Sequence, residues 1–315
     1  MPVDPQMQAV IERAAKSGLP SYCSVSAVEA RRLYKETRAV LSPPVPAVDA
    51  VRELAASGPA GPIALRLYRG LGAQAGALPA LVYFHGGGWT IGDLDTHDIV
   101  CRTLANNARC IVAAVDYRMG PEHKFPAAVD DCVAATRWVA EQAAALGVDA
   151  ARIAVGGDSA GGNLAAVVAI TLRDAGGPPL VFQALAYPAT DQRMDSASHT
   201  KFGAGYLLTR DNMLWFRDNY LAPTDYDDWR ASPLRAADLA RLPPAHIITA
   251  GYDPLVDEGR AYSDRLLAAG VPVLYECFEG MAHGFLTMGG VVAAANHALY
   301  RLGQSLALAF KPARA

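Results

Sequence analysis

Short apolar runs alternate with longer helix-like segments along most of the chain. Residues 79–84, 152–155 and 247–251 are largely apolar, which is typical of strands covered on both faces in a parallel sheet. Residues 164–172 are apolar, small-sided and free of proline, and they end near the Gly-Gly-Pro-Pro of residues 176–179, so they predict a helix with stop signals. The alternation predicts an α/β fold in which helices flank a mostly parallel central sheet.

Two segments do not fit this alternation. Residues 5–16 and 25–38 look helical and amphipathic, and the proline-rich residues 41–46 read as a linker. Residues 190–233 lie between two core strands and carry bulky side chains at helix-like spacing: Met213, Leu214, Trp215, Phe216 and Tyr220. We therefore expect a helical cap made of residues 1–46 and 190–233, the second part being inserted into a single domain of residues 47–315.

Composition and charge exclude several classes of protein. The 315 residues are 52% hydrophobic and carry a formal net charge of −3, which gives no sign of nucleic-acid binding or of a basic membrane-binding face. Five scattered cysteines without a C-x-x-C pair predict reduced thiols in a cytoplasmic protein. The first residues lack the features of a signal peptide, and no apolar stretch approaches the roughly 18 residues of a membrane span. Dinucleotide, P-loop and zinc-protease motifs are absent from the sequence.

The most informative motif is G-x-S-x-G, centred on Ser159. It lies between the predicted strand of residues 152–155 and the predicted helix of residues 164–172. A serine on such a sharp turn presents its hydroxyl at the edge of a sheet, above a helix N-terminus. The alternative is a glycine-rich turn that happens to contain a serine.

A second motif, His85-Gly-Gly-Gly-Trp89, follows the apolar run of residues 79–84. Consecutive glycines allow the backbone to point N–H groups into a cavity, where they can hold the negative oxygen of a tetrahedral intermediate. A flexible structural loop is the alternative. Both motifs in one chain favour a nucleophilic serine.

Such a serine needs a base, and the base needs an orienting acid. Of the seven histidines, His283 is the one that lies beyond a strand end, beside a glycine and before the last helix. Asp253 directly follows the predicted strand of residues 247–251 and is the favoured acid. Asp191, which follows another predicted strand, and Asp257, one helical turn later, remain alternatives. Ser159, Asp253 and His283 would then meet at one edge of the sheet, in the chain order of α/β-hydrolases.

With these motifs, the chain resembles the bacterial hormone-sensitive-lipase-like (family IV) carboxylesterases of the α/β-hydrolase superfamily. The resemblance runs from about residue 63 to the C-terminus, and its motifs are HGGGW at 85–89, DYR at 116–118, PEHKFPAA at 121–128, GDSAGG at 157–162, YP at 187–188, DPLVDE at 253–258 and HGF at 283–285. It implies Ser159 as nucleophile, His283 as base and Asp253 as orienting acid. It also implies the backbone N–H groups of Gly87, Gly88 and Ala160 as the oxyanion hole.

The function that this resemblance implies is hydrolysis of short- to medium-chain acyl esters through an acyl-enzyme. No metal or organic cofactor would be required. We expect a small-molecule ester as substrate, no nucleic-acid partner, no stable membrane association and a possible homodimer. An amidase or peptidase of the same fold and a non-catalytic small-ligand receptor are the alternatives, and the presence of His283 argues against the receptor.

Overall fold

One mixed sheet of eight strands runs through the centre of the protein in the computed structural model, which describes residues 1–311. Residues 312–315 of the predicted domain 47–315 lie outside the described part. The strand order is β1-β2-β4-β3-β5-β6-β7-β8. β1 pairs with β2 and β2 with β4 in antiparallel fashion, and all other neighbours are parallel. The bounds are β1 Ala50–Gly58, β2 Gly61–Arg69, β3 Leu78–Phe84, β4 Ile111–Asp116, β5 Val148–Asp158, β6 Phe182–Ala186, β7 Ala245–Tyr252 and β8 Val273–Ala282.

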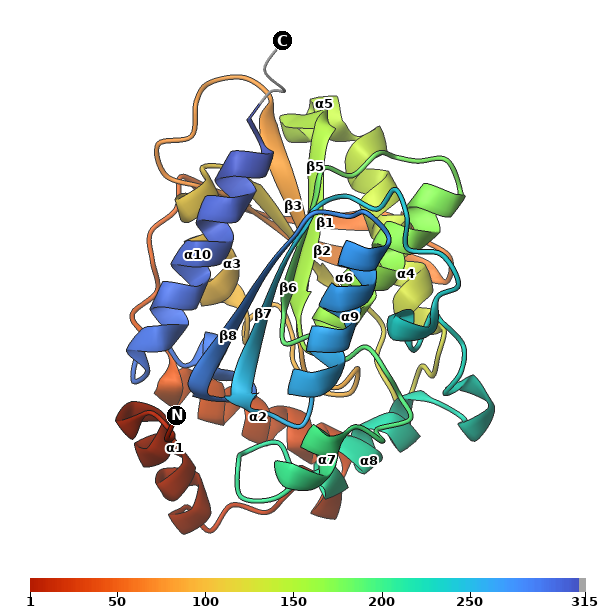
Figure 1. The fold of residues 1–315 in the computed structure, drawn as a ribbon. Helices are drawn as coiled ribbons and strands as arrows, with labels where there is room; N and C mark the ends of the chain where they lie inside the picture. Colours follow the sequence, from red (N-terminus) through yellow and green to blue (C-terminus); the bar gives the residue numbers. More distant parts are fainter. Residues whose placement is uncertain (312–315) are drawn as a thin grey trace.

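Helices cover both faces of the sheet (Figure 1). α3 and α10 pack against each other on one face, whereas α4, α6 and α9 lie on the other, with the short α5 before β5. Their bounds are α3 Asp98–Ala108, α4 Ala127–Glu141, α5 Ala143–Leu146, α6 Ala160–Asp174, α9 Val256–Ala268 and α10 Ala293–Ala309. Each face of the sheet thus has its own buried apolar cluster. The predicted fold class is confirmed.

The remaining helices lie together at one end of the molecule, toward which the arrows of β7 and β8 point (Figure 1). They are α1 Pro5–Lys16, α2 Ala27–Leu41, α7 Ala197–Lys201 and α8 Arg210–Tyr220. Asp4, Ser26 and Thr209 cap the first turns of α1, α2 and α8, because their side-chain oxygens accept backbone N–H groups there. These segments also touch each other: the Asn212 side chain accepts from the Ser21 hydroxyl at 2.8 Å.

Helix α6 packs directly on the backbone of the sheet at Gly161. A Cβ atom at this position would overlap the Phe84 carbonyl oxygen at the end of β3. A Cβ atom at Gly157, near the end of β5, would overlap the Phe84 carbonyl oxygen and the Gly161 backbone to the same degree. Strand and helix can therefore approach closely enough to form the sharp turn that contains Ser159.

We expect Gly161→Ala to destabilise the protein by about 3 kcal/mol, since the added methyl group meets backbone atoms that cannot move aside. Gly162→Ala is the matched control on the same helix, because its Cβ would lie 3.0 Å from the Pro188 Cβ and 3.1 Å from the Pro188 Cα, contacts that a shift of a few tenths of an ångström relieves. Urea unfolding measures both. Equal midpoints for wild type and Gly161→Ala would show that the close approach of α6 to β3 is not required.

Candidate active site

Ser159 occupies the turn between β5 and α6. Its backbone has φ 56° and ψ −118°, a region that residues other than glycine rarely adopt and that stores strain. Hydrogen bonds hold the turn on both sides. The Ser159 N–H donates to the Ala186 carbonyl at 2.9 Å, and its carbonyl accepts from the Asn163 N–H at 3.0 Å. The hydroxyl therefore has a fixed place at the sheet edge.

The structure brings Ser159, His283 and Asp253 together. His283 follows the last residue of β8, and its Nε2 lies 2.9 Å from the Ser159 Oγ. On the other side of the ring, Nδ1 lies 2.7 Å from the Asp253 Oδ2. Asp253 follows β7 and is fully buried, and its Oδ1 accepts the Leu255 N–H at 2.8 Å. Three strand ends thus supply one chain of hydrogen bonds.

The two alternative carboxylates have other partners. Asp191 forms a two-point ion pair with Arg235, at 3.0 and 2.7 Å. Asp257 accepts the Ser198 backbone N–H at 2.8 Å and lies in the first turn of α9. Among the hydrogen bonds and ion pairs of residues 1–311, neither carboxylate reaches His283.

The glycine loop lies beside Ser159, and Gly88 lines the same cavity as the serine. Gly87 and Gly88 have φ values of 121° and 58°. Phe216 of α8 packs so closely on Gly88 that a side chain there would overlap its ring. No acceptor within residues 1–311 takes the backbone N–H of Gly87, Gly88 or Ala160. These three donors are therefore available to a ligand.

Asp158, for which the sequence motifs predicted no role, joins the glycine loop to the serine turn. Its Oδ1 accepts the Tyr83 hydroxyl at 2.8 Å and the Gly86 N–H at 3.0 Å, and lies 3.3 Å from the His97 Nε2. Burial raises the pKa of Asp158, but the nearby His97 and the hydrogen bond from Tyr83 outweigh it, so the pKa lies below its ordinary value. An aspartate directly before the motif serine was the available signal.

The His85 side chain contacts the backbone of the glycine loop. Its Nδ1 lies 2.8 Å from the Gly86 carbonyl oxygen, to which a protonated Nδ1 donates, and its ring stacks on Tyr117 with centroids 4.4 Å apart. Burial, followed by the charge of His97, lowers the pKa of His85 to about 4. The imidazole is therefore neutral at physiological pH.

Two cavities adjoin the short loop that contains Leu207 and Leu208. The smaller, about 50 Å³, contains Ser159 and is walled by the glycine loop, residues 189–192, α8 and the start of α9. The larger, about 540 Å³, lies between α1, α2 and residues 207–212, and it reaches Met288, which approaches Gly284 beside His283. Leu207 lines the larger cavity and Leu208 the smaller, so this short loop separates the two.

No helix within residues 1–311 is both long enough and apolar enough to cross a membrane. In the same part of the chain, no three His, Cys, Asp or Glu side chains gather in a way that could hold a metal ion.

A hydrogen-bonded serine, histidine and aspartate beside three free N–H donors form the type of site found in serine hydrolases. Residues 81–287 match the family described as alpha/beta hydrolase fold. The chain belongs to this family, in its hormone-sensitive-lipase-like branch.

Relatives and solved structures agree with this assignment. The carboxylic ester hydrolase LipN of Mycobacterium tuberculosis is 43% identical over 95% of this chain and 82% of its own length. The ethyl acetate hydrolase of Pseudomonas putida is 38% identical over 97% of this chain and 99% of its own. The crystal structure of a hyperthermophilic esterase from the archaeon Pyrobaculum calidifontis superposes with a TM-score of 0.93 at 39% identity, covering 98% of this chain and 99% of that one. The ester-hydrolase EH1AB1 from the metagenome of Lake Arreo, complexed with a derivative of bipyridine phosphonate, gives a TM-score of 0.95 at 43% identity, covering 98% and 99%.

The neutral state of His85 predicts a pH dependence of stability. Because its pKa is about 4 in the folded protein and 6.5 ordinarily, the unfolded chain binds a proton first as pH falls. The contribution of the neutral His85 to the free energy of unfolding is therefore complete above pH 6.5. It is lost as pH falls toward 4, and the total loss is about 3 kcal/mol. We expect His85→Asn, measured by urea unfolding from pH 7 to 4, to flatten this part of the curve. His123→Asn is the control, and a wild-type slope in His85→Asn would contradict the assignment.

Proposed function

We propose that the protein is a carboxylic ester hydrolase with Ser159 as nucleophile, His283 as general base and Asp253 as orienting acid. The observation that carries this is the hydrogen-bonded chain from the Ser159 Oγ through His283 to the buried Asp253. The names of the similar proteins, a carboxylic ester hydrolase and an ethyl acetate hydrolase among them, support ester hydrolysis over amide hydrolysis or a receptor function.

The proposed reaction uses this geometry. The Ser159 Oγ attacks the ester carbonyl carbon while the His283 Nε2, 2.9 Å away, accepts the hydroxyl proton. Asp253 keeps the Nδ1 proton in place and stabilises the imidazolium that forms. The tetrahedral intermediate then expels the alcohol, which takes the proton from His283 and leaves an acyl group on Ser159. Water, deprotonated by His283, attacks this acyl group in the same way and releases the acid.

Gly87, Gly88 and Ala160 are the donors that we propose for the oxyanion. Their free backbone N–H groups lie on the two loops that flank Ser159, and Ala160 begins α6, whose dipole favours negative charge at its N-terminus. A donor of this kind contributes about 3–4 kcal/mol to the stability of the transition state. Asp158 fixes the relative place of the two loops through Gly86.

Short- to medium-chain acyl esters are the substrate class that we propose. The cavity around Ser159 is small and mostly apolar, with Met194, Leu208, Met213 and Phe216 in its wall. We assign residues 1–46 and 190–233 to a cap over residues 47–315, because α1 and α2 enclose the larger cavity and α8 contributes Met213 and Phe216 to the smaller.

We also propose a homodimer in the cytoplasm. β8 forms an edge of the sheet, and exposed apolar side chains of β8 and the neighbouring α10 lie beside it: Leu274, Tyr300 and Leu308. An unpaired strand edge flanked by apolar groups favours pairing with a second copy. The five cysteines are free thiols, in keeping with a reducing compartment.

Ser159→Ala tests the function. We expect the variant to fold normally and to lose turnover of p-nitrophenyl butyrate by a factor on the order of 10⁴ or more, since no other group can form the acyl-enzyme. A fluorophosphonate should label Ser159 alone in the wild type, as mass spectrometry of the modified peptide will show. Near-native turnover by Ser159→Ala would overturn the proposal.

Asp253→Asn tests the acid. We expect kcat to fall on the order of 10³-fold or more, because the amide can present its N–H instead of an acceptor to the His283 Nδ1. Asp191→Asn and Asp257→Asn remove a charge without touching His283 and should lose much less. If Asp191→Asn were the most damaging of the three, the orienting acid would be Asp191.

A further inference from the structure

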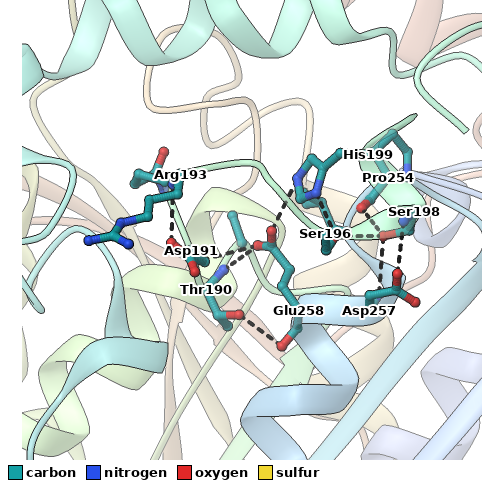
Figure 2. A network of polar contacts seen from close by, with 12 residues as sticks. Thr190, Asp191, Arg193, Ser196, Ser198, His199, Pro254, Asp257 and Glu258 are labelled. Carbon is teal, nitrogen blue, oxygen red and sulfur yellow. Dashed lines mark hydrogen bonds and ion pairs between the residues drawn. The ribbon is translucent and has the colours of Figure 1, made fainter. Parts of the chain in front are cut away.

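The first turn of α9 faces the inserted segment with two carboxylates (Figure 2). Asp257 and Glu258 come four and five residues after Asp253 in the chain. Asp257 is exposed and, within residues 1–311, its side chain accepts the Ser198 N–H at the start of α7, whereas Glu258 is 3% exposed. A carboxylate this deeply buried is costly unless the groups around it stabilise its charge.

Glu258 holds the backbone where the inserted segment begins. Its Oε1 accepts the Thr190 N–H at 2.6 Å and the Asp191 N–H at 3.3 Å. The Thr190 hydroxyl donates in return to the Glu258 backbone carbonyl at 3.0 Å. Side chain and backbone of one residue thus bind two consecutive residues of the segment (Figure 2).

Glu258 also faces a buried histidine of α7. The His199 Nε2 lies 3.2 Å from Oε2 of Glu258, and the His199 Nδ1 lies 2.6 Å from the Ser196 hydroxyl. His199 is itself 3% exposed. Burial raises the pKa of Glu258 above its ordinary value, and His199 and the two backbone N–H groups offset only part of this rise. The pair therefore joins α9 to α7 as well as to residues 190 and 191.

These contacts matter because the same backbone forms a wall of the cavity at Ser159. Ala189, Asp191 and Gln192 line that cavity, and Glu258 lines it from the α9 side. Asp253, which orients His283, lies on the loop that leads directly into α9. One short stretch of chain, residues 253–258, therefore carries both the acid and the attachment of the cavity wall.

We propose that Glu258 is a positioning residue that fixes the cavity wall of residues 189–192 and helix α7 relative to the loop carrying Asp253. This rests on the proposed esterase function for its consequence, which is selection between acyl lengths. The bond-making step at Ser159 does not use Glu258, so the carboxylate acts on the fit of the acyl group and not on the nucleophile.

The test compares Glu258→Ala, which removes both acceptors, with Glu258→Gln, which keeps one acceptor for the Thr190 and Asp191 N–H groups. Asp264→Asn is the matched control, an exposed carboxylate of the same helix, and His199→Leu removes the other half of the pair. Hydrogen exchange of residues 187–201 is followed by mass spectrometry. Steady-state kinetics use p-nitrophenyl acetate and p-nitrophenyl hexanoate.

We expect exchange of residues 187–201 to be about tenfold faster in Glu258→Ala than in wild type, with Glu258→Gln close to wild type. KM for the hexanoate should rise about tenfold while kcat for the acetate changes less than about threefold. His199→Leu should change both readouts in the same direction, so the result does not depend on one variant folding.

Unchanged exchange in Glu258→Ala and His199→Leu would overturn the positioning role, whether or not the protein hydrolyses esters. An equal loss of kcat on both esters would also overturn it, because Glu258 would then act on the reacting groups. Absence of Ser159-dependent hydrolysis in the wild type, with faster exchange in Glu258→Ala, would overturn the esterase function and leave the positioning role supported.

Discussion

The left-handed backbone of Ser159 is the constraint on which the rest of the site depends. A residue with a side chain in this region costs about 1–3 kcal/mol, so the surrounding structure must hold it there. The close approach of α6 to β3, which requires glycine at positions 157 and 161, leaves the turn no room to relax. Burial of nearly all of α6 stabilises this arrangement. The hydroxyl consequently meets His283 at hydrogen-bond distance without any movement of the chain.

The buried carboxylate of Asp158 fixes the glycine loop relative to the serine turn. Asp158 accepts the Gly86 N–H and so fixes the start of the loop to the residue before the serine. The next two N–H groups, of Gly87 and Gly88, then remain free. A neutral His85 completes the support, because a charged imidazole would place a second buried N–H at Nε2, which has no acceptor among the described residues. The contacts of Asp158 and of the neutral His85 thus hold the glycine loop in a conformation that leaves the Gly87 and Gly88 N–H groups free.

Elements with one dominant pattern were predictable from the sequence, and those set by distant contacts were not. The continuously apolar residues 79–84 and 247–251 coincide with the cores of β3 and β7. β1 was missed because most of its side chains are exposed and no apolar face marks it. Ser159, His283 and Asp253 could be chosen because each follows a strand. Glu258 could not, because its partner Thr190 lies 68 residues away and only the folded chain brings them together.

The α/β sheet layer and the helices that cover the site therefore contribute differently to the proposed function. The sheet and the helices on its faces supply every group that the proposed reaction uses, whereas residues 190–233, which include α8, form much of the cavity wall. The cavity wall must therefore be held rigidly against the sheet, because a wall displaced by about 1 Å would misplace the acyl group relative to Ser159. Contacts at the surface would not suffice, because exposed ion pairs such as Arg193–Asp227 contribute little. The buried contacts of Glu258 meet the requirement, because a carboxyl oxygen shielded from water binds the Thr190 and Asp191 N–H groups more strongly than an exposed one would.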